Sequence, residues 1–193
     1  MKNTLKGTLT EENLLKAFAG ESQARNRYTF FSSVAKQEGY EQIAALFLTT
    51  AEQEKEHAKR FFKYLEGGTA TIHNASYPAG IIGTTEQNLL AAAEGEHEEW
   101  DTLYSAFAET AHAEGFQKVA LTFKYVAEVE KEHERRYLKI LSRLTDGDFF
   151  RRDGEILWQC RNCGYIVKAK VAPKLCPSCE HTQAYFEPMA DNY

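Results

Sequence analysis

The feature that most constrains this chain is a motif that occurs twice. The segments AEQEKEH (residues 51–57) and AEVEKEH (residues 127–133) lie 76 positions apart. Each contains Glu-x-x-His, and side chains three residues apart on a helix project from one face. One such motif arises easily by chance in a glutamate-rich helix, but two copies at matching places indicate an internal repeat. The chain is therefore expected to fold as two similar halves that each contribute a carboxylate and an imidazole to one centre.

The region from about residue 10 to 145 has the spacing of amphipathic helices. Apolar side chains recur every three or four positions, which is the period of a helix face. The stretches with this period are 14–35, 43–64, 89–110 and 119–144. Four helices of this length are typical of a four-helix bundle. Thr8 and Glu11 predict a capping box at the first helix, and Gly67-Gly68 predicts the end of the second.

The connections between these helices predict the topology. Gly39 and Gly115 mark tight turns, so the first and second helices, and the third and fourth, are expected to be antiparallel neighbours. The segment 67–85 between the pairs has no helical period. A helix of about 25 residues is about 37 Å long, and an extended segment of this size spans that length. A long crossover is therefore feasible, which favours a ferritin-like arrangement over a simple up-down bundle.

The two halves differ by one residue in the third helix. Gly20-Glu21 matches Gly95-Glu96 at an offset of 75, whereas Tyr28 matches Tyr104 at 76. The extra residue thus lies between Glu96 and Tyr104. Because a helix often absorbs one inserted residue as a π-type turn, and such turns are frequent at functional sites, we predict one here and none in the first helix.

Four glutamates occupy helix positions that the pattern otherwise fills with apolar residues. They are Glu21, Glu54, Glu96 and Glu130. Burying ionised carboxylates is costly unless they pair or bind a metal. With His57 and His133 they give one Glu from each of two helices and Glu-x-x-His from the other two, a general signature of di-iron or di-manganese proteins. The alternative is that the four glutamates lie on solvated faces of glutamate-rich helices. The repeat argues against this alternative.

Three further residues in the same helix phase have two interpretations each. Glu99 lies three positions after Glu96, where the first half has Ala24. It is either an additional ligand present in one half or a solvent-facing acid, and we favour the ligand. Tyr28 and Tyr104 fall about two turns from the first glutamate of each half. They are either core residues or hydrogen-bond donors to ligand carboxylates, and their equivalence favours the second.

All four cysteines lie in the C-terminal tail, as two CxxC pairs separated by twelve residues. They are Cys160, Cys163, Cys176 and Cys179. Four thiolates at this spacing predict a tetrahedral metal site, and the spacing does not decide between zinc and iron. Short apolar runs around them predict β-strands in a module too small to fold without a metal. The expected domains are residues 1–146 and 147–193.

Composition excludes several classes of function. The net charge of −5 gives no basic surface for nucleic acid. No apolar run reaches the length of a membrane span, and the N-terminal segment lacks the apolar region of a signal peptide. Cysteines grouped as a metal site rather than spread as disulfides favour a reducing cytoplasm.

These motifs together resemble the rubrerythrin family over residues 8–187. The shared motifs are GES…EKEH, GEHEE…EKEH and CRNCGY…CPSC, the last resembling the two metal knuckles of rubredoxin. The fold class implied is all-α, a ferritin-like four-helix bundle with a long crossover, plus a small β-rich rubredoxin-like four-cysteine domain. The ligands implied for a di-iron centre are Glu21, Glu54, His57, Glu96, Glu99, Glu130 and His133. A mononuclear iron would be held by the four cysteines, with zinc or manganese as possible substitutes in the metal sites.

The resemblance also implies an activity. Members of the family are non-haem di-iron peroxidases that reduce hydrogen peroxide to water, with electrons relayed through the rubredoxin-type iron. One iron of the pair is expected to alternate between Glu99 and His57 with redox state. The electrons would come from NADH through a separate reductase or rubredoxin, since the sequence has no glycine-rich dinucleotide loop. A homodimer or higher homo-oligomer is expected. The alternatives are an iron-oxidising storage protein and an electron carrier with a structural zinc ribbon.

Overall fold

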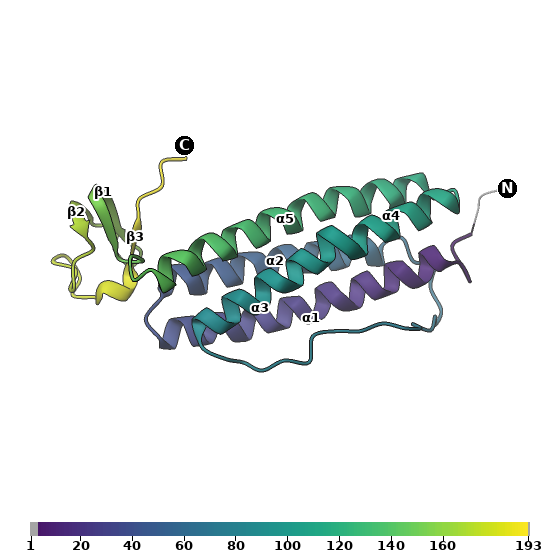
Figure 1. Cartoon of the computed structure of the whole chain (residues 1–193), viewed down its shortest axis with the longest axis horizontal. Helices are drawn as coiled ribbons and strands as arrows, with labels where there is room; N and C mark the ends of the chain where they lie inside the picture. The colour runs from purple at the N-terminus through teal and green to yellow at the C-terminus, as the bar shows by residue number, and fades with distance from the viewer. Residues whose placement is uncertain (1–3, 193) are drawn as a thin grey trace.

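The computed structural model describes residues 4–192 and consists of a long helical bundle with a small sheet at one end (Figure 1). The bundle contains α1 (Leu9–Gln37), α2 (Glu41–Phe62), α3 (Thr85–Glu98), the π-helical turn η1 (Glu99–Leu103), α4 (Tyr104–Ala113) and α5 (Gln117–Thr145). The C-terminal module contains β1 (Arg151–Cys160), β2 (Ile166–Val171), the 3₁₀ turn η2 (Gln183–Tyr185) and β3 (Phe186–Pro188). The predicted fold class is confirmed.

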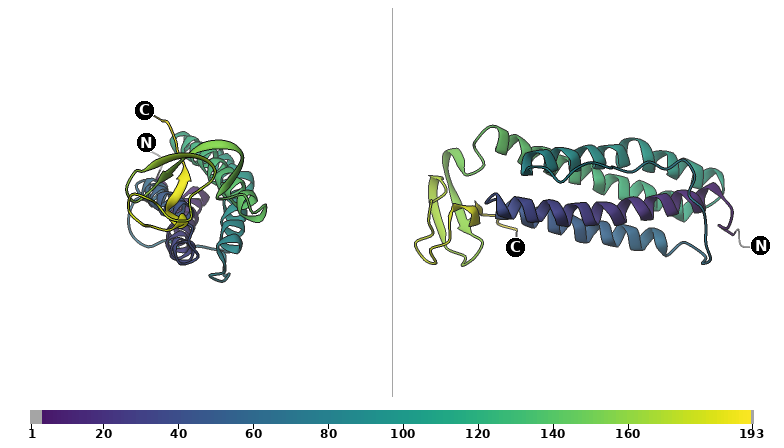
Figure 2. Two further views of the ribbon diagram at one scale, coloured as in Figure 1. Left: turned by 90° about the vertical axis from the view of Figure 1, so that its left-hand side faces the viewer. Right: turned by 90° about the horizontal axis from the view of Figure 1, so that it is seen from below.

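The bundle consists of two helical hairpins joined by a long crossover. α1 packs along α2, and the continuous α3–η1–α4 rod packs along α5. Gly39 and Gly115 end the first helix of each hairpin with φ of +85° and +89°, a conformation that glycine adopts without strain. The crossover, residues 63–84, runs lengthwise beside α1 (Figures 1 and 2). Both predictions about the topology are therefore confirmed.

The predicted π-type turn is present. Residues Glu99–Leu103 form a five-residue π-helix between α3 and α4, whereas α1 is one continuous α-helix over Leu9–Gln37. The inserted residue is thus absorbed within the bundle rather than in a loop. Ahead of it, Gly95-Glu96 occupies the place that Gly20-Glu21 occupies in α1, and beyond it Tyr104 corresponds to Tyr28.

Two helix ends differ from the sequence prediction. Thr8 is the N-cap of α1 and accepts from the backbone N–H of Glu11 at 3.1 Å, but the Glu11 carboxylate accepts from Gly7 instead of Thr8. The capping box is incomplete because the Thr8 N–H already donates to the carbonyl of Leu5. α2 ends at Phe62, before Gly67-Gly68. Just beyond this end, the Tyr64 hydroxyl lies 2.8 Å from Oγ1 of Thr122 on α5.

Two apolar clusters fill the bundle, one toward each end. The cluster near the sheet includes Phe31, Phe47 and Leu89, and the cluster near the start of α1 includes Leu14 and Phe61. Burial of such side chains supplies the main stabilisation of the bundle. The layer between the two clusters is polar, and it holds the glutamates and histidines singled out by the sequence.

The C-terminal module is a three-stranded antiparallel sheet in the order β2-β1-β3. Its small core contains Trp158 and Phe186, both fully buried. The module lies at the end of the bundle where α1 turns into α2 (Figure 2). A Cβ atom on Gly39 would lie 3.7 Å from Cβ of Ala184, and Tyr40 packs edge-on to Phe149 with ring centroids 5.4 Å apart. The described residues 4–192 include no helix long and apolar enough to cross a membrane.

Candidate metal centres

Four buried carboxylates converge from four helices in the polar layer. Glu21 on α1, Glu54 on α2, Glu96 on α3 and Glu130 on α5 each have a relative exposure of 0%. By contrast the acids two positions from the motif glutamates, on other faces of the same helices, are exposed. They are Glu52, Glu56, Glu128 and Glu132. The helix phase read from the sequence therefore separates the interior acids from the surface acids.

The interior acids and two histidines form two adjacent clusters, each able to surround one ion. One consists of Glu21, Glu54, His57 and Glu130, and the other of Glu54, Glu96, Glu130 and His133. Within each cluster the candidate ligand atoms lie within 4.8 Å of one another. Glu54 and Glu130 belong to both clusters, so their carboxylates are placed to bridge two ions. The structure thus brings together six of the seven predicted di-iron ligands.

Both imidazoles lie within a short distance of several carboxylates. Nδ1 of His57 lies 2.9 Å from Glu130, 3.1 Å from Glu54 and 3.7 Å from Glu21. Nδ1 of His133 lies 2.8 Å from Glu130, 3.0 Å from Glu54 and 3.5 Å from Glu96. Each histidine nitrogen therefore faces three carboxylates, a donor set that suits iron or manganese.

The electrostatics of the clusters call for cations. Burial, followed by the negative charge of Glu54, raises the pKa of Glu21 to about 8 and raises the pKa of Glu96 well above its usual range. For His133, contacts with Glu130, Glu54 and Glu96 outweigh burial, which acts in the opposite direction, and raise the pKa to about 12. Both carboxylate oxygens of Glu130 are buried without a hydrogen-bond donor. Two divalent ions would satisfy these groups and displace their protons, so the residues fit a two-metal centre.

The two tyrosines hold carboxylates of the opposite half of the repeat. The Tyr28 hydroxyl donates to Oε1 of Glu96 at 2.6 Å, and the Tyr104 hydroxyl donates to Oε1 of Glu21 at 2.5 Å. Both tyrosines are 1% exposed. Each hydrogen bond leaves the second carboxylate oxygen, Oε2, directed at a metal cluster, where it lacks a donor. The hydrogen-bonding role favoured from the sequence is therefore present, and it links the two hairpins.

Glu99 lies beside the centre but outside both four-residue clusters. It is the first residue of η1 and is partly buried. Its Oε1 lies 3.5 Å from the position that a Cβ on Gly20 would take, on the side of Glu21. Burial, and then the charges of Glu21 and Glu96, raise the pKa of Glu99 well above its usual range. Glu99 is thus neither an ordinary surface acid nor, in this arrangement, a member of a cluster.

Sequence reasoning missed Gln53. Its Oε1 accepts a hydrogen bond from Nε2 of His133 at 3.0 Å and another from Arg136 at 3.2 Å. A metal-binding histidine usually donates its second ring N–H to such an acceptor, which fixes the ring and its tautomer. The repeat places Val129, which cannot accept a hydrogen bond, at the equivalent position of the other half. This Gln/Val mismatch inside two otherwise similar motifs was the available signal. The two histidines are therefore held differently.

We expect Gln53→Leu to weaken metal binding at the His133 cluster by about 10- to 100-fold, the usual cost of losing such a partner. Titration of the apo-protein with metal, monitored by calorimetry, would measure the affinity of each of the two sites. Gln53→Glu keeps an acceptor and should preserve binding, and Val129→Leu at the matching position should have little effect. Equal weakening at both sites in Gln53→Leu would show that Gln53 supports the bundle and does not orient His133.

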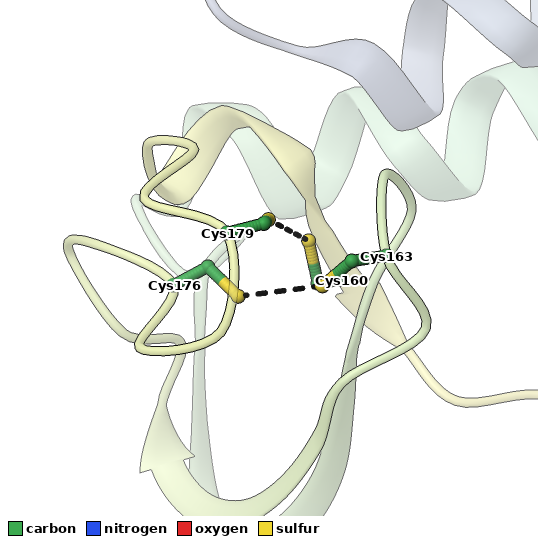
Figure 3. Close-up of side chains that lie close together, drawn as sticks. All are labelled: Cys160, Cys163, Cys176 and Cys179. Atoms are coloured by element: carbon green, nitrogen blue, oxygen red, sulfur yellow. Dashed lines mark hydrogen bonds between the residues drawn. The ribbon is translucent and has the colours of Figure 1, made fainter.

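The four cysteines of the C-terminal module form a second metal site. Cys160 is the last residue of β1, and the two CxxC turns face each other so that the sulfurs converge (Figure 3). Sγ of Cys160 lies 3.8 Å from Sγ of Cys179, and Sγ of Cys163 lies 3.6 Å from Sγ of Cys176. A tetrahedral site with metal–sulfur bonds of about 2.3 Å places sulfurs about 3.8 Å apart. The thiols are free and fit a four-thiolate ion.

The environments of these thiols differ. A hydrogen bond from the backbone N–H of His181 lowers the pKa of Cys179 to about 6, whereas burial raises the pKa of Cys160 to about 11. Cys160 and Cys176 are buried, and Cys163 is exposed at the surface of the module. The ion would therefore lie close to solvent on the Cys163 side, where a redox partner can approach it.

Comparisons with known proteins agree with this geometry. The family model described as Rubrerythrin matches residues 12–141, and the model described as Rubrerythrin, rubredoxin-like domain matches residues 158–187. The chain is 65% identical over 193 residues to rubrerythrin of Porphyromonas gingivalis, covering 100% of this chain and 96% of that one. It is 48% identical over 190 residues to rubrerythrin of Nitratidesulfovibrio vulgaris, covering 98% and 99% of the two chains.

A solved structure has a similar fold. A mixed-valence state of nigerythrin aligns with a TM-score of 0.63 at 32% identity, covering 97% of this chain and 89% of that one. The matches span both the bundle and the four-cysteine module, so the carboxylate–histidine centre and the thiolate site are a di-iron site and a rubredoxin-like site. The chain belongs to the rubrerythrin family.

Proposed function

We propose that this protein is a hydrogen peroxide reductase that serves in oxidative-stress defence. The observation that carries the proposal is the combination, on one chain, of a buried two-metal centre with shared carboxylates and a partly exposed four-thiolate site. Reduction of one hydrogen peroxide to two waters consumes two electrons and two protons. Two adjacent irons, when bound, supply both electrons at once, and the four-thiolate iron returns them one at a time.

The residues proposed to hold the two irons follow from the clusters. Glu21 and His57 would hold one ion and Glu96 and His133 the other, while Glu54 and Glu130, which belong to both clusters, would serve both ions. Tyr28 and Tyr104 fix the orientation of the two outer glutamates. The two apolar clusters cover the centre toward both ends of the bundle. The cysteines hold the third iron.

The position of the four-thiolate site supports a homodimer. The module packs against the start of α2, near Glu41, whereas Glu54 lies 13 residues further along the same helix. At 1.5 Å per residue, this separates the two sites within one chain by about 20 Å or more. A head-to-tail pair of chains would bring each thiolate iron closer to the partner's two-iron centre. Sedimentation of the iron-loaded protein at twice the mass of one chain is the expected result.

The electron source is proposed to be external. Electrons would pass from NADH through a separate reductase, or through a rubredoxin, to the exposed Cys163 side of the module. Free thiols suited to metal binding agree with a reducing cytoplasm as the site of action.

Two other functions are distinguishable from this one. An iron-oxidising storage protein needs the carboxylate centre but gains nothing from a redox relay on the same chain. A simple electron carrier needs the thiolate site but not a buried pair of bridged metal clusters. The proposal accounts for both sites with one reaction.

The test is to reduce the iron-loaded protein anaerobically and mix it with hydrogen peroxide or with oxygen in a stopped-flow instrument. We expect faster re-oxidation by peroxide, with return of the visible absorption of the four-thiolate iron. Faster re-oxidation by oxygen, with release or accumulation of ferric iron, would favour the storage function. Re-oxidation of the thiolate iron alone would favour the carrier.

Glu99 gives a further prediction that belongs to this reaction. We expect Glu99→Ala to fold normally, because Ala24 occupies the equivalent place in α1. It should slow turnover, since the oxidised iron, a harder acid, loses a carboxylate ligand that His57 cannot replace. Iron content, helicity and peroxide turnover are the measurements, and Glu94→Ala, at an exposed acid of α3, is the control. Full turnover with two irons bound would show that Glu99 is not a ligand.

A further inference from the structure

A pocket of about 280 Å³ lies beside the candidate metal centre, between the bundle and the crossover. Figure 1 shows the crossover running along this side of α1. The residues that matter for the argument are Gly20, Arg27, Asn74, Tyr77, Glu99 and Tyr104. Two of these, Glu99 and Tyr104, lie next to the two-metal centre, and two others, Asn74 and Tyr77, come from the crossover. The pocket therefore reaches from the surface to Glu99 and Tyr104, which lie beside the centre.

Gly20 is one of the residues that line this pocket. It is buried inside α1, directly before Glu21. A Cβ atom added at Gly20 would lie 3.5 Å from Oε1 of Glu99 and 3.9 Å from Cε1 of Tyr77. Glycine inside a helix is unfavourable compared with alanine, so its presence calls for a reason other than helix stability. We attribute the glycine to the space that it leaves open, because a larger side chain would fill the gap between Glu99 and the crossover.

The outer wall of the pocket is held in place by hydrogen bonds from the crossover to α1. The Tyr77 hydroxyl donates to the carbonyl of Lys16 at 3.1 Å, and the backbone N–H of His73 donates to Glu12 at 2.8 Å. Tyr77 is 39% exposed and lies at the rim of the pocket. This wall is a defined part of the structure, although residues 63–84 contain no helix or strand.

The chemistry of the lining suits a small polar molecule. Arg27 and Asn74 contribute hydrogen-bond donors, and the volume is below that of sites for drug-sized ligands. The π-turn η1 begins at Glu99 and so places this carboxylate at the inner end. On the opposite side of the centre, His57 lies at a surface hollow between α2 and α5 that Leu48 and Val129 also line. A small molecule could instead reach the metal centre through that hollow.

We propose that the pocket beneath the crossover is the entry route for hydroperoxide, with Gly20 keeping the inner passage open and Tyr77 limiting the size of what enters. This inference rests on the proposed peroxide reductase function. Gly20 and Tyr77 are specificity-determining residues in this scheme and do not act in the chemistry. The reaction itself is unchanged.

The test uses variants that narrow or widen the pocket in the full-length iron-loaded protein. Gly20→Val and Tyr77→Trp narrow it, Tyr77→Ala widens it, and Tyr77→Phe removes only the hydrogen bond to Lys16. Val129→Phe narrows the hollow at His57 and is the matched control. The measurements are the second-order rate constants for re-oxidation by hydrogen peroxide and by tert-butyl hydroperoxide, and the association rate of azide with the oxidised protein.

We expect Gly20→Val to lower the hydrogen peroxide and azide association rates by about tenfold or more, within the roughly one to three decades over which association rates vary among mutants of one interface. Tyr77→Ala should increase the rate with tert-butyl hydroperoxide relative to hydrogen peroxide several-fold, whereas Tyr77→Phe and Val129→Phe should match the parent protein. If Gly20→Val loses iron, Tyr77→Trp provides the same comparison from the rim.

The experiment distinguishes failure of the entry-route proposal from failure of the peroxide reductase function. If Val129→Phe slows peroxide and azide while the Gly20 and Tyr77 variants do not, entry occurs at the His57 face and the proposal is overturned. If the parent protein is not re-oxidised by peroxide at all, the peroxide reductase function fails, but the azide rates still decide whether this pocket leads to the centre.

Discussion

Replacing Glu130 with alanine is expected to abolish peroxide turnover and the binding of both irons of the centre. Glu130 belongs to both clusters, and its two oxygens approach His57 and His133 at 2.9 and 2.8 Å. Loss of an outer partner of a metal ligand costs about 10- to 100-fold, so loss of a shared ligand should exceed the upper figure. Iron analysis and steady-state peroxide consumption measure the effect.

The apo-form of this variant should keep its helical content, because alanine favours a helix and removes one of several buried acids. The thermal stabilisation that added ferrous iron gives the parent protein should be lost, since ligand binding stabilises only the state that binds it. Glu128→Ala is the matched control, two residues away on the exposed face of α5. An iron-replete, active Glu130→Ala protein would remove Glu130 from the proposed bridge.

Exchanging iron for zinc in the four-cysteine site is expected to stop turnover with an external electron donor. Zinc occupies the same tetrahedral thiolate site but does not change redox state, so the relay to the centre is broken. The two-iron centre itself is unaltered in this form. A single re-oxidation of the chemically reduced centre by peroxide should therefore proceed at the rate of the all-iron protein.

The readouts for this exchange are independent of each other. Visible absorption from thiolate-bound iron should be absent in the zinc form, and circular dichroism should show the same fold. Restoring iron to the site in the same preparation should restore turnover. Equal steady-state turnover with zinc and with iron would show that electrons reach the centre without passing through the cysteines.

The sequence by itself predicted the fold, six of the residues that meet in the two carboxylate–histidine clusters, and the four cysteines. The helix period placed Glu54 and Glu130 inward and Glu52 and Glu128 outward, because burial depends on phase around a helix axis. The 76-residue repeat paired the two motifs, and the change of offset placed the π-turn at Glu99–Leu103. Spacing alone defined the four-thiolate site, since the two CxxC turns are local structures.

Only the tertiary structure decided which residues from different helices contact each other. Tyr28 and Tyr104 each donate to the glutamate of the other hairpin, which depends on how α1 crosses the α3–α4 rod. Gln53 reaches His133 across the bundle, 80 residues away in the chain. No periodicity within one helix encodes such a contact, because it depends on the relative position of two separate helices.

The position of Glu99 was also beyond the sequence. Its phase in the helix predicted a ligand, and the structure places its carboxylate beside Gly20 at the inner end of a pocket under the crossover. The crossover has no helical or strand period, so its path, and the pocket that it forms with α1, depend on contacts with α1 such as the hydrogen bond from the backbone N–H of His73 to Glu12. Residue type and period determine which groups turn inward, whereas the packing of distant segments determines which of them meet.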